Sequence, residues 1–232
     1  MTTLYILAGA SVAVSVVTAA LRNRGLEKGR FITKMISSML FCLVAFWAAV
    51  TRGEPMNTQA ALMLGALVLG MVGDIVLGLD MFVAKDDRKF VFVLGGVPFF
   101  LGHLLYIALL LSYGNIQWHL VAVLPVVPMF FLLLDRFKLI ELKRMMLPLA
   151  AYGLVLGAMM LATFSLAATR GGELLGKWMW FPGVLFTVSD ASLFLNKFGR
   201  GPLEKLRPVF SYTVMVPYYA AQGIFALAVA WL

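Results

Sequence analysis

The sequence predicts an all-α integral membrane protein with eight transmembrane helices. Of its 232 residues, 62% are hydrophobic and only 13% are charged, whereas a soluble domain is about half apolar and a quarter charged. The mean hydropathy is +0.94. Apolar runs of about 20 residues, the length that crosses a bilayer as a helix, recur along the whole chain. These runs do not alternate between apolar and polar positions, as the strands of a membrane β-barrel do.

The apolar runs give the eight expected spans in order, and the connections between them are too short for a soluble domain. We therefore expect a single integral membrane domain over residues 1–232. The fifth span is the shortest and contains Pro125 and Pro128, so we expect it to be tilted or broken. Pro98 and Pro217 fall inside the fourth and eighth spans and are expected to kink them. The expected spans are 2–21, 31–50, 60–82, 90–112, 119–134, 145–168, 178–196 and 209–231.

The basic residues predict the orientation. The net charge is +8, and 15 of the 19 Lys and Arg residues lie in the odd-numbered connections. Even-numbered connections hold only Arg52, Arg170 and Lys177. By the positive-inside rule, odd connections are cytoplasmic and both termini are non-cytoplasmic. The charge thus sets topology, and we expect no nucleic-acid partner. The compact loops favour a bacterial inner (plasma) membrane. The 15 residues are Arg22, Arg24, Lys28, Arg30, Lys85, Arg88, Lys89, Arg136, Lys138, Lys143, Arg144, Lys197, Arg200, Lys205 and Arg207.

Two motifs occur twice along the chain. The segment 73–80 (GDIVLGLD) matches 189–196 (SDASLFLN), and 97–103 (VPFFLGH) matches 216–222 (VPYYAAQ). The shared pattern is D-x-x-L-x-x-[DN] followed by VP-aromatic-aromatic-x-x-[HQ]. Since each half contains four spans, both halves insert with the same orientation. The sequence therefore predicts two parallel four-helix repeats, about 1–115 and 116–232.

Each repeat places one acid inside an apolar span. Asp74 and Asp190 are costly in lipid, which favours a functional role for both. Their positions put them equally deep, in the cytoplasmic halves of spans three and seven. His103, in span four, is expected near mid-depth. We expect a polar pocket between spans three, four, seven and eight that opens toward the cytoplasmic leaflet. Asp80 lies near the interface and is expected to be solvated.

Lys34 lies close to the cytoplasmic end of span two. Position alone slightly favours a side chain that snorkels to the membrane surface; the alternative is that it neutralises a lipid phosphate or an aspartate. Cys42 is the only cysteine, and no HExxH, Walker, GxSxG or Rossmann motif is present. We therefore predict no metal and no cofactor.

Five short motifs follow one another along the chain: Lys34 in span two, Gly73 and Asp74 in span three, His103 and Tyr106 in span four, Ser189, Asp190 and Leu193 in span seven, and Tyr218, Tyr219, Ala221 and Gln222 in span eight. This ordered set resembles the YhhN-like lysoplasmalogenase family of integral membrane proteins. A departure is Met35, which follows the span-two lysine where the family pattern has proline. The resemblance implies hydrolysis of the vinyl-ether bond of lysoplasmalogens to a fatty aldehyde and glycerophosphoethanolamine or glycerophosphocholine. The partners would then be a lysophospholipid substrate and membrane lipids.

Two carboxylates suit this chemistry, because vinyl-ether hydrolysis needs a proton donor, an anion near an oxocarbenium ion and a base for water. We expect Asp74 and Asp190 to form the acid/base pair, without assigning which is the donor, and we expect either Asp→Asn change to abolish turnover. Lys34 is expected to meet the phosphate. The other candidate substrate-binding residues are His103, Tyr106, Ser189, Tyr218, Tyr219 and Gln222.

Two other functions fit the same pattern. A proton-coupled transporter of a small molecule or lipid would also use parallel repeats and paired acids at mid-depth. A lipid-binding or assembly subunit without chemistry would tolerate both Asp→Asn changes. Head-group preference and oligomeric state are left open by the sequence.

Overall fold

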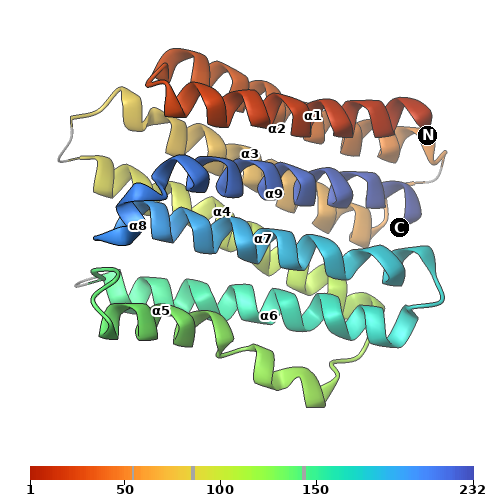
Figure 1. Cartoon of the computed structure of the whole chain (residues 1–232). Helices are drawn as coiled ribbons and strands as arrows, with labels where there is room; N and C mark the ends of the chain where they lie inside the picture. Colours follow the sequence, from red (N-terminus) through yellow and green to blue (C-terminus); the bar gives the residue numbers. More distant parts are fainter. Residues whose placement is uncertain (54, 85–86, 143–144) are drawn as a thin grey trace.

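The computed structural model describes residues 1–53, 55–84, 87–142 and 145–232, and these ranges form a bundle of roughly antiparallel helices (Figure 1). No strand occurs in them, and their one isolated backbone bridge joins Ile140 to Gly199. The helical elements are α1 (Thr2–Asn23), α2 (Glu27–Thr51), α3 (Thr58–Gly78), η1 (Leu79–Met81), α4 (Arg88–Tyr113), η2 (Trp118–Val123), α5 (Val126–Arg136), α6 (Met146–Arg170), α7 (Leu174–Phe198), α8 (Pro202–Lys205), α9 (Arg207–Ala228) and η4 (Val229–Trp231).

Within the described residues, eight helical segments are long and apolar enough to cross a membrane. This confirms the predicted all-helical class and the number of spans, and indicates an integral membrane protein. The observed helices run further than the apolar runs: α2 begins at Glu27 and α7 at Leu174, where hydropathy predicted 31 and 178. Charged residues at the helix ends continue the helix without adding hydropathy, so the predicted boundaries were too short.

The fifth span is broken, as its prolines predicted. A 3₁₀ segment, η2, ends at Val123, and α5 starts at Val126 after a turn that contains Pro125. A proline has no N–H to continue the helical ladder. In contrast, α4 and α9 continue through Pro98 and Pro217, and the kinks expected there stay predictions.

Helix α9 is the centre of the bundle. It is the most buried of the eight spans and packs against α1, α2, α3 and α7. The segment η2–α5 is the least buried and packs on α6 at the periphery (Figure 1). Helices α3 and α4 lie close together because Gly73 has no side chain: a Cβ there would lie 2.6 Å from Cε2 of Phe99.

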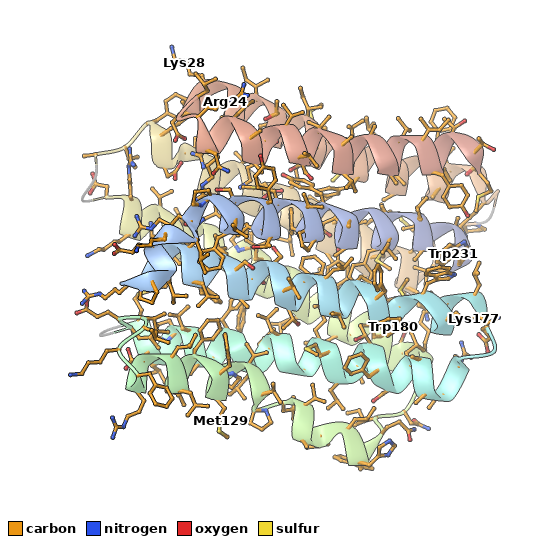
Figure 2. All side chains as sticks on the ribbon, in the orientation of Figure 1. Arg24, Lys28, Met129, Lys177, Trp180 and Trp231 are labelled. Carbon is orange, nitrogen blue, oxygen red and sulfur yellow. The ribbon has the colours of Figure 1, made fainter. Side chains whose placement is uncertain are left out.

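The α1–α2 and α7–α9 connections lie at one end of the bundle, together with the C-terminal ends of α3 and α5 and the N-terminal ends of α4 and α6, and both termini lie at the other end (Figure 1). Arg24 and Lys28 extend from the first of these ends and Lys177 from the second (Figure 2). This arrangement agrees with the expected topology, although membrane sidedness and the parallel repeat stay predictions. Three basic residues used for that prediction lie outside the described ranges: Lys85, Lys143 and Arg144.

Candidate active site

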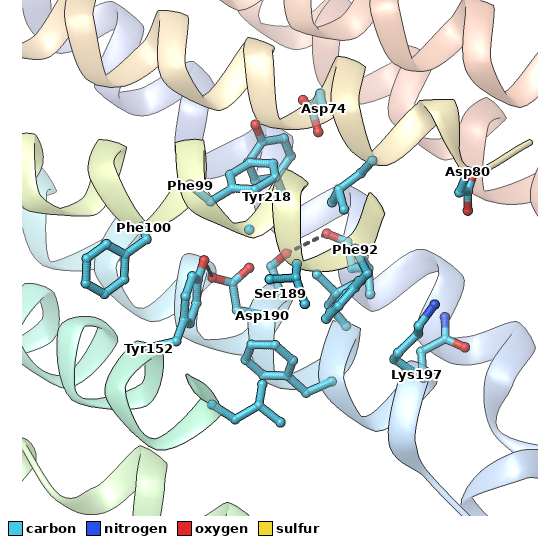
Figure 3. A pocket seen from close by; sticks show the side chains of 18 of the residues that line it. Asp74, Asp80, Phe92, Phe99, Phe100, Tyr152, Ser189, Asp190, Lys197 and Tyr218 are labelled. Atoms are coloured by element: carbon cyan, nitrogen blue, oxygen red, sulfur yellow. Dashed lines mark hydrogen bonds between the residues drawn. The ribbon is translucent and has the colours of Figure 1, made fainter. Parts of the chain in front are cut away.

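A cavity of about 310 Å³ opens between the helices in the half of the bundle that carries the odd-numbered connections (Figure 3). Its size falls at the lower end of the range for ligand pockets, roughly 300–1,000 Å³. Spans three, four, seven and eight line it, as predicted, through α3, α4, α7 and α9. Helices α1, α2 and α6 also contribute, so the pocket has more walls than the sequence indicated.

Asp74 lines this pocket, and both of its carboxylate oxygens have polar partners. The Lys34 Nζ is 3.1 Å from its Oδ1. The other oxygen, Oδ2, accepts a hydrogen bond from the Ser38 hydroxyl at 2.6 Å and lies 3.1 Å from the Tyr219 hydroxyl. Every oxygen of this buried carboxylate therefore faces a donor, which is what burial of a charge requires.

The Lys34 side chain is 7% exposed and points inward to Asp74. The expectation that it snorkels to the membrane surface is wrong. An anion on the adjacent α3 attracts the ammonium more strongly than the interface does, because an unpaired carboxylate at this depth would be very costly. The observed partner is an aspartate, which was one of the predicted alternatives. The predicted contact of Lys34 with a lipid phosphate stays untested.

Asp190 has fewer partners. Its Oδ2 accepts a hydrogen bond from the Tyr152 hydroxyl at 2.9 Å, and the His103 Nε2 lies 3.7 Å away from that same oxygen (Figure 3 shows the first contact). No Lys or Arg within the described ranges lies at ion-pair distance from this carboxylate. Among the described residues, Asp190 therefore faces the pocket without a paired cation.

The tautomer of His103 follows from the contact that its Nδ1 makes. Nδ1 lies 2.6 Å from the backbone oxygen of Phe99, and a carbonyl oxygen only accepts, so Nδ1 carries a proton. The buried Nε2 has no hydrogen-bond partner. In a neutral imidazole this nitrogen is an acceptor directed at Asp190, suited to take or return a proton on that carboxyl group.

A second polar chain lies deeper in the bundle. The Tyr106 hydroxyl donates to Gln222 Oε1 at 2.6 Å, and Gln222 Nε2 donates to the Tyr218 hydroxyl at 3.0 Å. Gly70 makes room for it, because a Cβ at this position would lie 2.2 Å from Gln222 Nε2. The chain links α4 to α9 and ends at Tyr218 in the pocket wall.

The structure thus divides the predicted site residues into two groups. Five line the pocket: Lys34, Asp74, Ser189, Asp190 and Tyr218. Four are buried behind it: His103, Tyr106, Tyr219 and Gln222. The hydroxyl of Ser189 donates to the backbone oxygen of Val214 at 2.8 Å, so it ties α7 to α9.

Two site residues were missed by the sequence analysis. Ser38 follows Lys34 by four residues and so shares its helix face, a signal that could have found it. Tyr152 is a polar group inside the apolar sixth span, where its hydroxyl needs a partner. Both hydroxyls contact an acid predicted to be functional.

Asp80 also differs from expectation. Its Oδ1 lies 2.6 Å from Nη2 of Arg30, a residue that we had placed in the first connection and that is instead buried in α2. Asp80 is therefore paired as well as partly exposed. No group of three or more His, Cys, Asp or Glu side chains in the described part of the chain is arranged to hold a metal ion.

Comparison with known proteins identifies the family. A sequence model of the YhhN family matches residues 29–229, which is most of the chain. The chain belongs to the YhhN family. The resemblance inferred from the motifs is thereby confirmed. Searches of curated proteins and of solved structures found no match, so substrate and chemistry have to be argued from the site.

Proposed function

We propose that this YhhN-family protein is a lysoplasmalogenase-type hydrolase, in which Asp190 is the proton donor to the vinyl ether. Family membership is consistent with a hydrolase. The observation that carries the proposal is the unequal coordination of the two pocket acids: Lys34 pairs with Asp74, whereas Asp190 has a phenol and an imidazole as neighbours. Paired acids divide their roles when their environments differ in this way.

In the first step, the carboxylic acid of Asp190 gives its proton to the β-carbon of the vinyl ether. The π electrons form the new C–H bond, and the α-carbon and ether oxygen become an oxocarbenium ion beside the new Asp190 carboxylate. The fixed Asp74 carboxylate adds a second negative charge on the pocket wall. Negative charges that are already held where positive charge develops lower the activation barrier, because no side chain or solvent has to reorganise during the reaction.

In the second step, water adds to the α-carbon and loses a proton to the Asp190 carboxylate, which restores the acid. The resulting hemiacetal then breaks its bond to the glycerol oxygen, and that oxygen takes the hemiacetal proton. The products are a fatty aldehyde and the glycerophospho-alcohol. His103, through Nε2, is placed to hold or relay a proton at Asp190 during these exchanges.

The pocket walls support an amphiphilic substrate. Around the polar residues, the pocket wall consists largely of apolar side chains, and α4, α6 and α7 supply many of them, among them Phe100, Leu149 and Phe194. Val93 and Val97 belong to the pocket lining and are also exposed on the outside of α4. An alkyl chain that leaves the pocket beside α4 would therefore pass directly into lipid.

The test is aldehyde release from lysoplasmenyl-ethanolamine by the purified, detergent-solubilised protein. The proposal expects aldehyde and glycerophosphoethanolamine in equal amounts. The corresponding acyl lysolipid, which lacks the vinyl ether, serves as the control substrate and should release no aldehyde. A folded protein that forms no aldehyde but carries out proton-dependent uptake in proteoliposomes would overturn the proposal in favour of a transporter.

A further inference from the structure

The mouth of the pocket contains a polar cluster that the proposed reaction does not use. Arg22 lies at the end of α1, and Asn196 and Lys197 lie at the end of α7, and all three line the cavity. Lys197 and Asp80 mark this end of the pocket in Figure 3, away from Asp190. Residues about 175 positions apart in the sequence are thus brought to one opening.

The two basic side chains of the cluster interact electrostatically with Asp80 over some distance, but neither forms an ion pair with a described carboxylate. Arg30, a neighbour of the cluster, is already paired: its Nη2 lies 2.6 Å from Asp80 and its Nε 2.6 Å from Glu27 Oε2. Within the described part of the chain, by contrast, no carboxylate lies at ion-pair distance from Arg22 or Lys197. Lys197 lies over the ring of Phe92, 5.1 Å from its centroid, a contact that leaves its three N–H donors available for an anion.

Asn196 gives an independent sign of a ligand. Its side chain is nine-tenths buried in the pocket lining, and its amide nitrogen has no hydrogen-bond partner. A buried donor without an acceptor is costly and rare in proteins. Guanidinium, ammonium and amide N–H groups all donate, so the missing ligand has to supply several acceptor oxygens. A phosphate group does so and binds such groups through strong charge-assisted hydrogen bonds.

We propose that Arg22, Asn196 and Lys197 form a subsite for the phosphate group of a lysophospholipid at the pocket mouth. This inference deepens the proposed function and rests on it for the position of the reactive bond. It places the phosphate about two helical turns from Asp190. Lys34, which the sequence analysis assigned to phosphate, keeps its partner Asp74.

The spacing fits such a ligand. Lys197 follows Asp190 by seven residues, so both lie on one face of α7, separated by about 10 Å along the helix. Seven bonds separate the β-carbon of a vinyl-ether lysolipid from its phosphorus. An extended chain advances roughly 1.2 Å per bond, or about 8 Å in total. A lysolipid with its β-carbon at Asp190 would therefore bring its phosphate to the cluster.

The test is equilibrium binding of radiolabelled lysophosphatidylethanolamine to the full-length protein in a maltoside detergent, which contains no phosphate. Monoacylglycerol with the same chain is the control ligand. In the Arg22→Gln/Lys197→Gln variant we expect the Kd for the phospholipid to rise at least about tenfold, because two charge-assisted contacts are lost. The Kd for monoacylglycerol should stay within about twofold, because it has no phosphate to lose.

The matched control is Arg24→Gln/Lys28→Gln. It removes the same charge close by, from side chains that extend away from the bundle (Figure 2), and should leave both Kd values unchanged. As a second variant, Asn196→Asp puts a negative charge at the cluster and should raise the Kd for the phospholipid but not the Kd for monoacylglycerol. The proposed subsite is overturned if the Kd values of both ligands rise equally in the variants, or if neither Kd rises.

Displacement by glycerophosphoethanolamine or inorganic phosphate separates the possible sources of the phosphate. Displacement at millimolar concentration would identify a free phosphate compound as sufficient, whereas binding that resists both requires the lipid chain. The radiolabelled ligand has an ester in place of the vinyl ether. Its binding therefore stays measurable even if the aldehyde assay overturns the hydrolase proposal, and the two failures are distinguishable.

Discussion

Asp74 and Asp190 occupy matching positions in the sequence motifs, but the structure surrounds them differently. Around Asp74, α2 supplies the Lys34 ammonium and the Ser38 hydroxyl, and α9 adds a phenol. Around Asp190, α6 supplies only the Tyr152 hydroxyl, and the His103 imidazole approaches to 3.7 Å. In the view of Figure 3, Tyr218 lies in the pocket wall between the two acids.

This difference indicates how a repeated motif can serve two purposes. A carboxylate with a cation and two hydroxyls is a fixed charge, stabilised in one state. A carboxyl group beside an imidazole acceptor and an open pocket is able to exchange a proton with a ligand. The matching motifs supply two acids to one pocket. In the proposed mechanism, the helices that pack on them, α2 and α6, determine which one acts on the substrate.

The largest effect on stability is expected at Asp74. The Asp74→Asn change leaves the buried Lys34 ammonium without its anion and should lower the free energy of unfolding by about 3–5 kcal/mol. The double variant Lys34→Met/Asp74→Asn removes both charges and should recover at least half of that loss. Thermal or denaturant unfolding of the purified variants measures both values. Equal destabilisation in the single and double variants would contradict a fixed ion pair at Asp74.

A smaller effect, confined to activity, is expected at Tyr152. The Tyr152→Phe change removes one hydroxyl from Asp190 and should lower kcat about tenfold, corresponding to about 1.4 kcal/mol. The matched control is Tyr219→Phe, since Asp74 keeps Lys34 and Ser38 when that phenol is lost. Aldehyde-release kinetics of the two variants provide the comparison. If Tyr219→Phe loses more activity than Tyr152→Phe, the proposed assignment of the two acids is reversed.

A second effect on stability, smaller than the one at Asp74, is expected at the packing that positions Tyr218. A methyl group at Gly70 would overlap Gln222 Nε2, so Gly70→Ala should destabilise the protein by about 1–3 kcal/mol. Gly9→Ala is the matched control in α1, where a Cβ meets no atom within 4 Å. Helix propensity favours that alanine by up to about 1 kcal/mol. Thermal unfolding of both variants measures the difference, and a neutral Gly70→Ala would show that Gln222 is not held in this way.

Much of the fold was predictable because apolar length and proline positions act locally. The eight spans and the break before α5 followed from these features. The family assignment followed from short ordered motifs, which family comparison confirmed. The contact predicted between Lys34 and a lipid phosphate stays a prediction, because it concerns a bound ligand. The parallel repeat stays a prediction as well, because it concerns a symmetry axis that relates the two halves.

The partners of the acids were harder to predict, because they depend on which helices pack together. Asp80 was expected to be solvated, but α2 brings Arg30 beside it. Lys34 was expected at the membrane surface, but its side chain points from α2 toward Asp74 on α3. Tyr152 comes from α6, which no motif connects to the site. A contact between distant helices leaves no local pattern in a single sequence, and these residues became visible only in the packed bundle.

The most direct test of the difference between the two acids is the rate of aldehyde release by Asp190→Asn and Asp74→Asn, measured at saturating lysoplasmenyl-ethanolamine together with thermal unfolding. Loss of a general acid typically costs about 10²–10⁴-fold in rate. The account predicts a loss of at least this order in Asp190→Asn with near-normal stability, and lower stability with more residual activity in Asp74→Asn. It would be contradicted if Asp190→Asn kept more than about a tenth of the wild-type rate.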